Sequence, residues 1–424
     1  GSENFAKGHR FGFFPSIAVG YNISNEKFWQ PIKPVISNLK IRGSWGLVGN
    51  DATNAGRFAY MEDLVLGGSD SYTTGIRQDT YYSGPSWNRY FNPDLTWEVG
   101  EKINLGLDLQ LFNDFNLTFD IFREKRRDIF MTRENSIPEI VGTGETKITS
   151  NNGEMENKGL DLAIDYNKQI TKDFFLSFKS TLTFARNKVL KMDEPPYFEY
   201  PGLSDVGHPL GTYWGYVADG LFPDQETIDN SPRQDLGYTP QPGDIKYVNQ
   251  PNAKGEYDNV INSNDRVAIG HPYDPELVYG FGPSMKWKNW DFSFFFQGVA
   301  RTSFMMYGMH PFGTTSIKNM LQFVADDHWS VDNPNPNAAY PRLTKDSNGN
   351  NDQYSTYWLR NAAFLKLKNA EIGYTYKGMR FYLSGVNLLT FSPFKHWDPE
   401  MGGGNGLYYP TQRVFNIGFQ MTIQ

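Results

Sequence analysis

The sequence predicts an all-β fold of about eleven antiparallel strands that form one sheet with an apolar face and a polar face. Three observations support this fold class. One hairpin alternates strictly between apolar and polar residues, the same alternation recurs along the chain, and the connections between the segments are alternately short and long. Together these observations favour a membrane-spanning β-barrel over a soluble sandwich.

The clearest hairpin spans residues 103–121. Successive side chains of a strand point to opposite faces, so one of its faces is apolar and the other polar. In an outer-membrane barrel the apolar face contacts lipid and the polar face lines the lumen. The residues predicted to face lipid are Ile103, Leu105, Leu107, Leu109, Phe115, Leu117, Phe119 and Ile121, and those predicted to face the lumen are Asn104, Asp108, Gln110, Asn116, Thr118 and Asp120. One half-buried sheet of a soluble protein has the same pattern.

The alternation recurs in further segments, which raises the strand count to about eleven. They are residues 160–167, 174–184, 279–287, 290–296, 370–376, 381–389 and 415–423, with less regular segments at 11–21 and 39–48. Between Leu367 and Ala370 the apolar phase moves from odd to even positions. Either a β-bulge or the exit of the strand from the bilayer explains this slip.

The connections predict the orientation of the strands. Those near Asn113, Gln169, Lys288 and Gly378 are short, whereas those at 49–93, 128–157, 188–275, 302–361 and 392–412 are long. Short periplasmic turns and long extracellular loops are typical of bacterial outer-membrane barrels. A soluble sandwich has no reason to place every long loop at one end.

Composition excludes several classes of function. The 424 residues carry a net charge of −7, which argues against nucleic-acid binding, and the absence of cysteine excludes thiolate chemistry. The six histidines are scattered, so neither a catalytic constellation nor a metal site is expected, and no cofactor is predicted. No secretory signal is recognisable at the start, so we expect a piece of a longer exported precursor, with residues 1–424 forming one domain.

Several motifs, in a fixed order, resemble one family. They are G-D-I-K-Y (243–247), N-D-R-V-A-I-G (264–270), P-E-L-V-Y-G-F (275–281), F-L-K-L-K-N-A-E-I-G-Y (364–374) and D-P-E (398–400). With L-K-I-R-G-S-W-G-L-V-G-N (39–50) upstream, the chain resembles the C-terminal half of SusC/RagA-type TonB-dependent outer-membrane transporters of the Bacteroidota. The resemblance spans nearly the whole chain.

The resemblance implies the C-terminal half of a 22-stranded transmembrane barrel. The N-terminal half of the barrel, the plug and the segment that contacts TonB are then absent from this sequence. The expected partners are a SusD-like surface lipoprotein, TonB, outer-membrane lipid and a glycan or peptide substrate. One departure concerns calcium: the acidic loop that often follows G-D-I-K-Y is largely replaced in residues 249–255, so no calcium is predicted there.

Aromatic residues in the long loops are candidates for contact with a substrate or partner, because flat rings stack on sugars. They are Tyr213, Trp214, Tyr216, Trp329, Tyr357, Trp358, Trp397, Tyr408 and Tyr409. The alternative for each is that it packs the loops together.

Three functions remain open at this point. The chain is part of a TonB-dependent nutrient importer, a passive porin-like channel, or a soluble all-β glycan-binding protein. For a half-barrel we also expect two unpaired edges, at the segments 11–21 and 415–423, since bacterial single-chain barrels have even strand numbers.

Overall fold

The computed structural model describes residues 1–421 except 53–55, 68–70, 134, 136, 139, 141–147, 308–320 and 345–346. Within this part, eleven strands form one antiparallel sheet in which neighbours in space are also neighbours in strand order along the chain. They are β1 (Ser16–Asn22), β2 (Ile36–Asn50), β7 (Glu98–Leu111), β8 (Phe115–Thr132), β9 (Thr149–Thr171), β10 (Phe174–Lys191), β17 (Leu277–Trp287), β18 (Trp290–Ala300), β21 (Phe364–Tyr376), β22 (Met379–Phe391) and β23 (Val414–Met421). The predicted fold class and strand number are confirmed.

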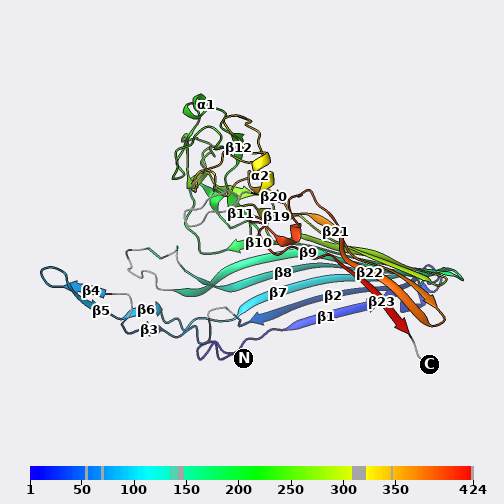
Figure 1. The fold of residues 1–424 in the computed structure, drawn as a ribbon. Helices are drawn as coiled ribbons and strands as arrows, with labels where there is room; N and C mark the ends of the chain where they lie inside the picture. The colour runs from blue at the N-terminus through cyan, green and yellow to red at the C-terminus, as the bar shows by residue number, and fades with distance from the viewer. Residues whose placement is uncertain are drawn as a thin grey trace.

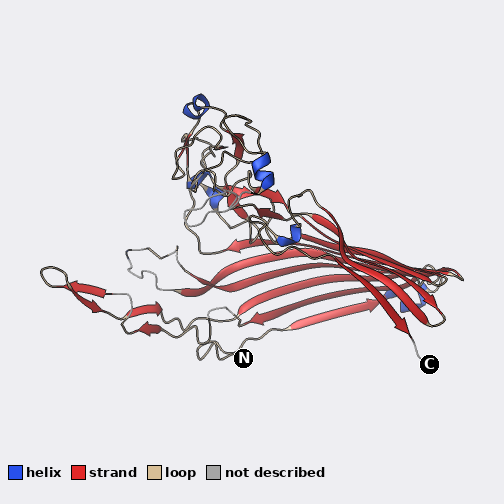
Figure 2. Cartoon of the chain, in the orientation of Figure 1, coloured by secondary structure: helices blue, strands red, loops and turns tan. Residues whose placement is uncertain are grey.

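The sheet is open. Figures 1 and 2 show the strands side by side in a curved sheet, with β1 at one edge and β23 at the other. Every residue of β1 except Asn22 is exposed, as is every residue of β23 except Gly418. Two unpaired edges are therefore present among the described residues, as expected of half a barrel; residue 423, assigned to the last strand, lies outside them.

Short and long connections lie at opposite ends of the sheet. At one end the turns 112–114, 172–173, 288–289 and 377–378 join strands directly. Asn113, Lys288 and Lys377 have φ values of 62°, 52° and 48°, the left-handed conformation that tight hairpin turns require. The fifth connection at this end, 23–35, contains the 3₁₀ helices Ile23–Asn25 and Lys27–Trp29. All long connections lie at the other end, which we call the outer end.

One predicted loop is partly strand. Residues 128–157 were expected to form a long connection, but β8 continues to Thr132 and β9 begins at Thr149. The apolar-polar alternation ends near Ile121 because charges then occupy both faces, among them Arg123, Lys125 and Arg126. Pairing between the strands continues without this alternation, held partly by ion pairs such as Arg123–Glu156 at 2.6 Å.

The two faces of the sheet differ in character, while contact with lipid or with a lumen stays a prediction. Leu107 lies beside Ile41 on β2 and Phe119 on β8, which places three apolar side chains in one row. On the opposite face Arg42 forms ion pairs with Asp108 at 3.4 Å and Asp120 at 2.6 Å. None of the eight residues predicted to face lipid is buried, and Leu105 is 61% exposed. A sheet with its apolar face uncovered is the reverse of a soluble core.

The slip in β21 is a β-bulge. Phe296 pairs with Leu367 and Phe295 with Asn369, so Lys368 is the extra residue opposite β18. On the other side of β21, the pairing with β22 is also irregular at Asn387, which has a φ of 56°. The two irregularities return the apolar residues of β21 to one face, so exit from the bilayer is not needed to explain the slip.

The outer connections contain short elements. They are β3 (Asp63–Val65), β4 (Ser71–Thr74), β5 (Thr80–Ser83), β6 (Ser86–Arg89), β11 (Tyr213–Gly215), β12 (Ala218–Leu221), α1 (Gln225–Asp229), β13 (Arg233–Gln234), β14 (Ile245–Tyr247), β15 (Val260–Ile261), β16 (Val267–Ile269), β19 (Ser303–Met305), α2 (Gln322–Asp326), β20 (Leu359–Asn361) and the 3₁₀ helices Pro201–Leu203, Ser263–Asp265 and Pro399–Met401. Among the described residues, no helix combines the length and the apolar composition needed to cross a membrane.

Candidate functional site

Three outer connections, 192–276, 301–363 and 392–413, pack into one body that we call the loop domain (Figure 1). Its core contains fully buried side chains from two of these connections, such as Ile245 and Tyr340, and Phe394 from the third. Backbone hydrogen bonds also join the three connections. The backbone N–H of Tyr216 donates to the carbonyl of Tyr354 at 2.8 Å, and that of Gly404 donates to the carbonyl of Met305 at 2.8 Å. The largest hydrophobic core in the described residues therefore lies outside the sheet.

Most of the aromatic residues predicted to bind a substrate or partner lie in this core or pack against it. Tyr216, Trp329 and Trp358 are buried within it, and Tyr213, Tyr357 and Trp397 pack against it. Trp214 donates its indole N–H to Asp205 at 2.6 Å. Only Tyr408 and Tyr409 of the nine are exposed, at 54% and 80%. Contact with a ligand stays a prediction for all nine, but for six the packing alternative has a structural basis.

A buried carboxylate organises one side of the loop domain. Asp244, in the motif G-D-I-K-Y, has no exposed surface. Its Oδ1 accepts hydrogen bonds from Arg342 Nε at 2.7 Å, Asn351 Nδ2 at 2.9 Å and Asn348 Nδ2 at 3.0 Å. These bonds tie residues about one hundred positions apart into a fixed arrangement, since a buried charge needs paired donors.

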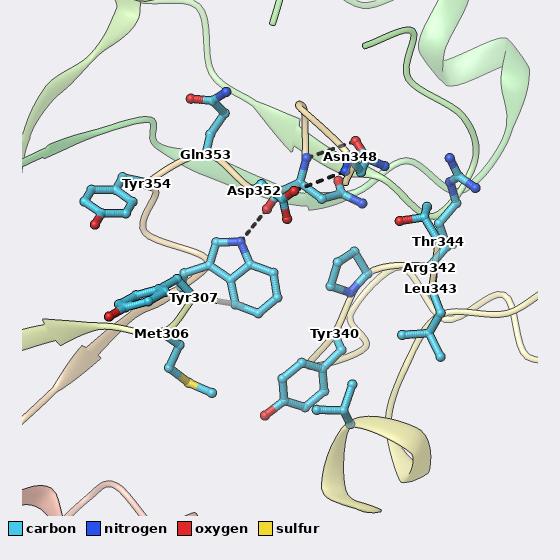
Figure 3. Close-up of a pocket in the computed structure, with 14 residues that line it drawn as sticks. Met306, Tyr307, Tyr340, Arg342, Leu343, Thr344, Asn348, Asp352, Gln353 and Tyr354 are labelled. Carbon is cyan, nitrogen blue, oxygen red and sulfur yellow. Dashed lines mark hydrogen bonds between the residues drawn. The ribbon is translucent and has the colours of Figure 1, made fainter. Parts of the chain in front are cut away.

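A cavity of about 300 Å³ opens beside this network (Figure 3). Tyr307, Tyr340, Tyr354 and Trp358 supply aromatic walls, and Arg342, Asn348, Asp352 and Gln353 supply polar groups. Trp358 is fixed by a hydrogen bond from its indole N–H to the carbonyl of Asn351 at 2.6 Å. An apolar cavity with a few polar groups on one side is the usual form of a small-molecule site.

Tyr307 and Tyr354, which line this cavity, belong to a group of exposed tyrosines. We call Tyr273, Tyr307, Tyr354 and Tyr408 the tyrosine cluster; each is between 48% and 57% exposed. A hydrogen bond between the hydroxyls of Tyr307 and Tyr408 raises the pKa of Tyr307. Burial raises the pKa of the neighbouring Tyr213 to about 12, and proximity to Tyr273 and Tyr354 adds to this increase.

Glycines allow the tyrosines to approach the backbone. Gly402, Gly404 and Gly406 have φ values of 79°, 93° and 71°, which side chains rarely adopt. A Cβ atom on Gly404 would lie 3.4 Å from the Tyr408 ring and 3.5 Å from the Tyr307 ring. Gly404 is thus packed beneath two rings.

Ion pairs anchor the loop domain to the polar face of the sheet. Lys366 of β21 has no exposed surface and lies 2.6 Å from Asp398 and 2.5 Å from Glu400, which also pairs with Lys368. Burial raises the pKa of Glu400, but the hydrogen bonds from Lys366 and Lys368 outweigh it, and the pKa is lowered. Two motifs that were only recognised separately in the sequence, F-L-K-L-K and D-P-E, therefore form one ionic cluster.

Sequence reasoning missed part of this site. Tyr273, Tyr307 and Tyr354 were not among the candidates, because nothing in their sequence surroundings sets them apart from other loop tyrosines. The ion pairs of Lys366 could have been predicted. Lys366 and Lys368 have no acidic partner on the neighbouring strands, whereas the acidic motif D-P-E follows in the next outer connection. In the described part of the chain, no three His, Asp or Glu side chains are grouped as metal ligands.

Comparisons with known proteins agree with this architecture. The family model described as "TonB dependent receptor-like, beta-barrel" matches residues 1–388. The chain is 29% identical to TonB-dependent receptor SusC of Bacteroides thetaiotaomicron, and 27% identical to TonB-dependent receptor P3 of Formosa agariphila. The alignments cover 99% of this chain but only 41% and 43% of these relatives.

A solved structure of similar fold is that of the RagAB peptide transporter. It superposes with a TM-score of 0.74 at 21% identity, over 99% of this chain and 44% of that chain. This likeness concerns the fold. The chain thus spans less than half of the length of the proteins it matches.

Proposed function

Because the chain belongs to the TonB-dependent receptor-like β-barrel family, and hence to an outer-membrane protein, we propose that it is the C-terminal barrel half of a TonB-dependent nutrient importer. The observation that carries the proposal is the loop domain, which is anchored by Lys366 to the polar face of the sheet. A recognition surface over the lumen is what selective uptake requires. The family consists of receptors and transporters, not enzymes.

In this proposal the apolar residues of the hairpin 103–121 contact lipid and the polar ones line the lumen. The cargo is an oligosaccharide or a peptide. Both classes present flat or apolar surfaces that stack on tyrosines, together with groups that hydrogen-bond to amides and carboxylates. The solved relative is a peptide transporter by its description, which keeps the peptide alternative open for this chain.

The partners of the proposed importer follow from the same relatives. A SusD-like lipoprotein would bind the outer end. TonB would act through the upstream part of the polypeptide, which would also supply the remaining barrel strands. A soluble glycan-binding protein is excluded by the family assignment, whereas a passive channel differs only in its energy source.

The test is uptake by cells that carry the full-length receptor. We expect uptake of candidate glycans and peptides to require TonB, and the variant Tyr307→Ala/Tyr354→Ala to weaken it. Tyr257→Ala is the matched control, because Tyr257 is 61% exposed in the loop domain but is not in the tyrosine cluster. Uptake that persists without TonB would indicate a passive channel. Equal uptake by both variants would remove the tyrosine cluster from the proposal.

A further inference from the structure

The cavity of about 300 Å³ in the loop domain has an apolar floor. Met306, Val324, Tyr340 and Trp358 form this floor, and all four are buried members of the loop-domain core. In Figure 3 Met306 and Tyr340 lie at the bottom of the view. Protein cores hold few voids larger than a water molecule, and an unfilled apolar cavity lowers stability. A cavity of this size in a packed core therefore favours an occupant.

The cavity is also open to solvent. Three of the residues that line it, Tyr307, Asp352 and Tyr354, are exposed. A tyrosine has an apolar ring and a polar hydroxyl, so it suits a place where a ligand passes from water to an apolar floor. A ligand can thus bury an apolar part in the floor and keep a polar part beside these three residues.

Most polar groups that line the cavity already have partners within the protein. The side chains with such partners are those of Arg342, Asn348, Asn351, Gln353 and Trp358. Arg342 donates from Nε to Asp244 and from Nη2 to the hydroxyl of Tyr238, both at 2.7 Å. The amide of Asn351 donates to Asp244 and accepts from the backbone N–H of Ile245 at 2.9 Å. The polar side of the cavity is therefore held in place by protein contacts and leaves few groups for a ligand in the floor.

This chemistry distinguishes the two cargo classes of the proposed function. A sugar ring carries hydroxyls on most of its carbons, and a hydroxyl that is buried without a partner is unfavourable. An apolar side chain needs no partner and gains by leaving water. Since an engineered apolar cavity of about 150 Å³ binds benzene, the larger cavity of this chain has room for a phenyl or indole ring.

We propose that this cavity is a specificity pocket that binds one large apolar side chain of a peptide cargo, whose backbone stays at the exposed residues. The inference rests on the proposed function, because it names the cargo of that importer as a peptide. It is independent of the energy source. Uptake without TonB would overturn the importer and leave the pocket, whereas cargo binding by glycans alone would overturn the pocket and leave the importer.

The test is photo-cross-linking in outer membranes that carry the full-length receptor with its natural partners. The probe is the peptide Ala-Ala-X-Ala-Ala with benzoylphenylalanine at X. We expect links to Met306, Leu343 or Trp358 by mass spectrometry, and competition by the same peptide with tryptophan at X but not with aspartate at X. Links only elsewhere, or no competed link, as when protein side chains fill the cavity, would overturn the proposal. Equal competition by the trisaccharide cellotriose would also overturn it.

Two variants at one position test whether the space itself matters. Leu343 lines the cavity and is partly buried, so Leu343→Trp should fill the cavity and lower the yield of the link roughly tenfold. Leu343→Ala enlarges the cavity and should keep the link. Leu236→Trp is the matched control, because Leu236 is partly buried against the same core but does not line the cavity.

Each yield is divided by the amount of protease-resistant receptor in the same membranes, so that loss of assembly is not mistaken for loss of binding. A wild-type yield in Leu343→Trp, or an equal loss in Leu343→Ala and in the control, would show that the cavity does not hold the side chain.

Discussion

The sheet and the loop domain use the same kinds of residue in opposite ways. In the sheet, large apolar side chains such as Leu105 and Ile417 are exposed, at 61% and 87%, while charged residues pair on the polar face. In the loop domain many aromatic residues are buried in a core, and Lys366 pairs with Asp398 and Glu400 at the junction with the sheet. Apolar side chains lie on the outside of a sheet that is surrounded by lipid, whereas they lie in the interior of a domain that is surrounded by water. The two regions of this one chain therefore place their apolar side chains in opposite ways.

The largest expected effect tests the junction between these regions. In the full-length receptor, Lys366→Met leaves Asp398 and Glu400 without their buried partner, at a cost of about 3–5 kcal/mol. We expect faster hydrogen exchange and proteolysis in residues 392–413, with the strands still protected. Lys377→Met in a short turn is the control. Unchanged protection of 392–413 would mean that the ionic cluster is not what anchors this connection.

The next prediction concerns the apolar face of the sheet. Leu107→Arg should cost roughly 2–4 kcal/mol of barrel stability if the residue lies near the bilayer midplane, whereas Asp108→Asn on the polar face should cost little. Refolding titrations of the full-length receptor into lipid measure both. Similar losses for the two variants would mean that this strand does not face a bilayer.

A third prediction concerns the interior of the loop domain. Asp244→Asn removes a buried charge that accepts hydrogen bonds from Arg342 and two asparagines, and we expect a loss of about 1.5–3 kcal/mol. The loss should appear as faster hydrogen exchange around 241–247 and 342–352. Asp332→Asn, at an exposed position of the same domain, should have no such effect. If both variants behave alike, Asp244 does not organise the domain.

The smallest effect is a pH dependence of the loop domain. Desolvation beside Phe323, Phe394 and Trp397 lowers the pKa of His396, the charge of Arg360 lowers it further, and the Tyr340 hydroxyl lies 3.4 Å away. The unfolded state therefore binds the proton more readily. The stabilising contribution is present above the ordinary histidine pKa of about 6.5 and is lost as the pH falls through it toward the folded value.

We expect hydrogen exchange near residues 392–397 to accelerate between about pH 7.5 and 5.5, after correction for intrinsic rates, while the sheet stays unchanged. His396→Phe should remove this acceleration. An identical response in the variant would assign the pH dependence to another group.

The two regions also differ in how much of them the sequence predicts. Strand alternation located all eleven strands and the bulge near Lys368, because a sheet with two unlike faces repeats its pattern every second residue. The pattern failed where β8 and β9 carry charges on both faces, and residues 11–15, expected to open the first strand, precede β1. The aromatic loop residues gave no comparable pattern. Trp329 and Trp358 contact core residues far away in the chain, and no local periodicity reports such packing.

The charged extension of β8 and β9 locates the upper limit of the apolar band on three adjacent strands. On the apolar face, Glu101, Arg123 and Lys158 each follow, toward the outer end, the last apolar residues Ile103, Ile121 and Leu160. Beyond Arg123, β8 continues to Thr132, which at about 3.3 Å per residue adds roughly 30 Å of strand. Strands β8 and β9 therefore extend well beyond the apolar band, so in the proposed importer the rim of the entrance would be uneven in height.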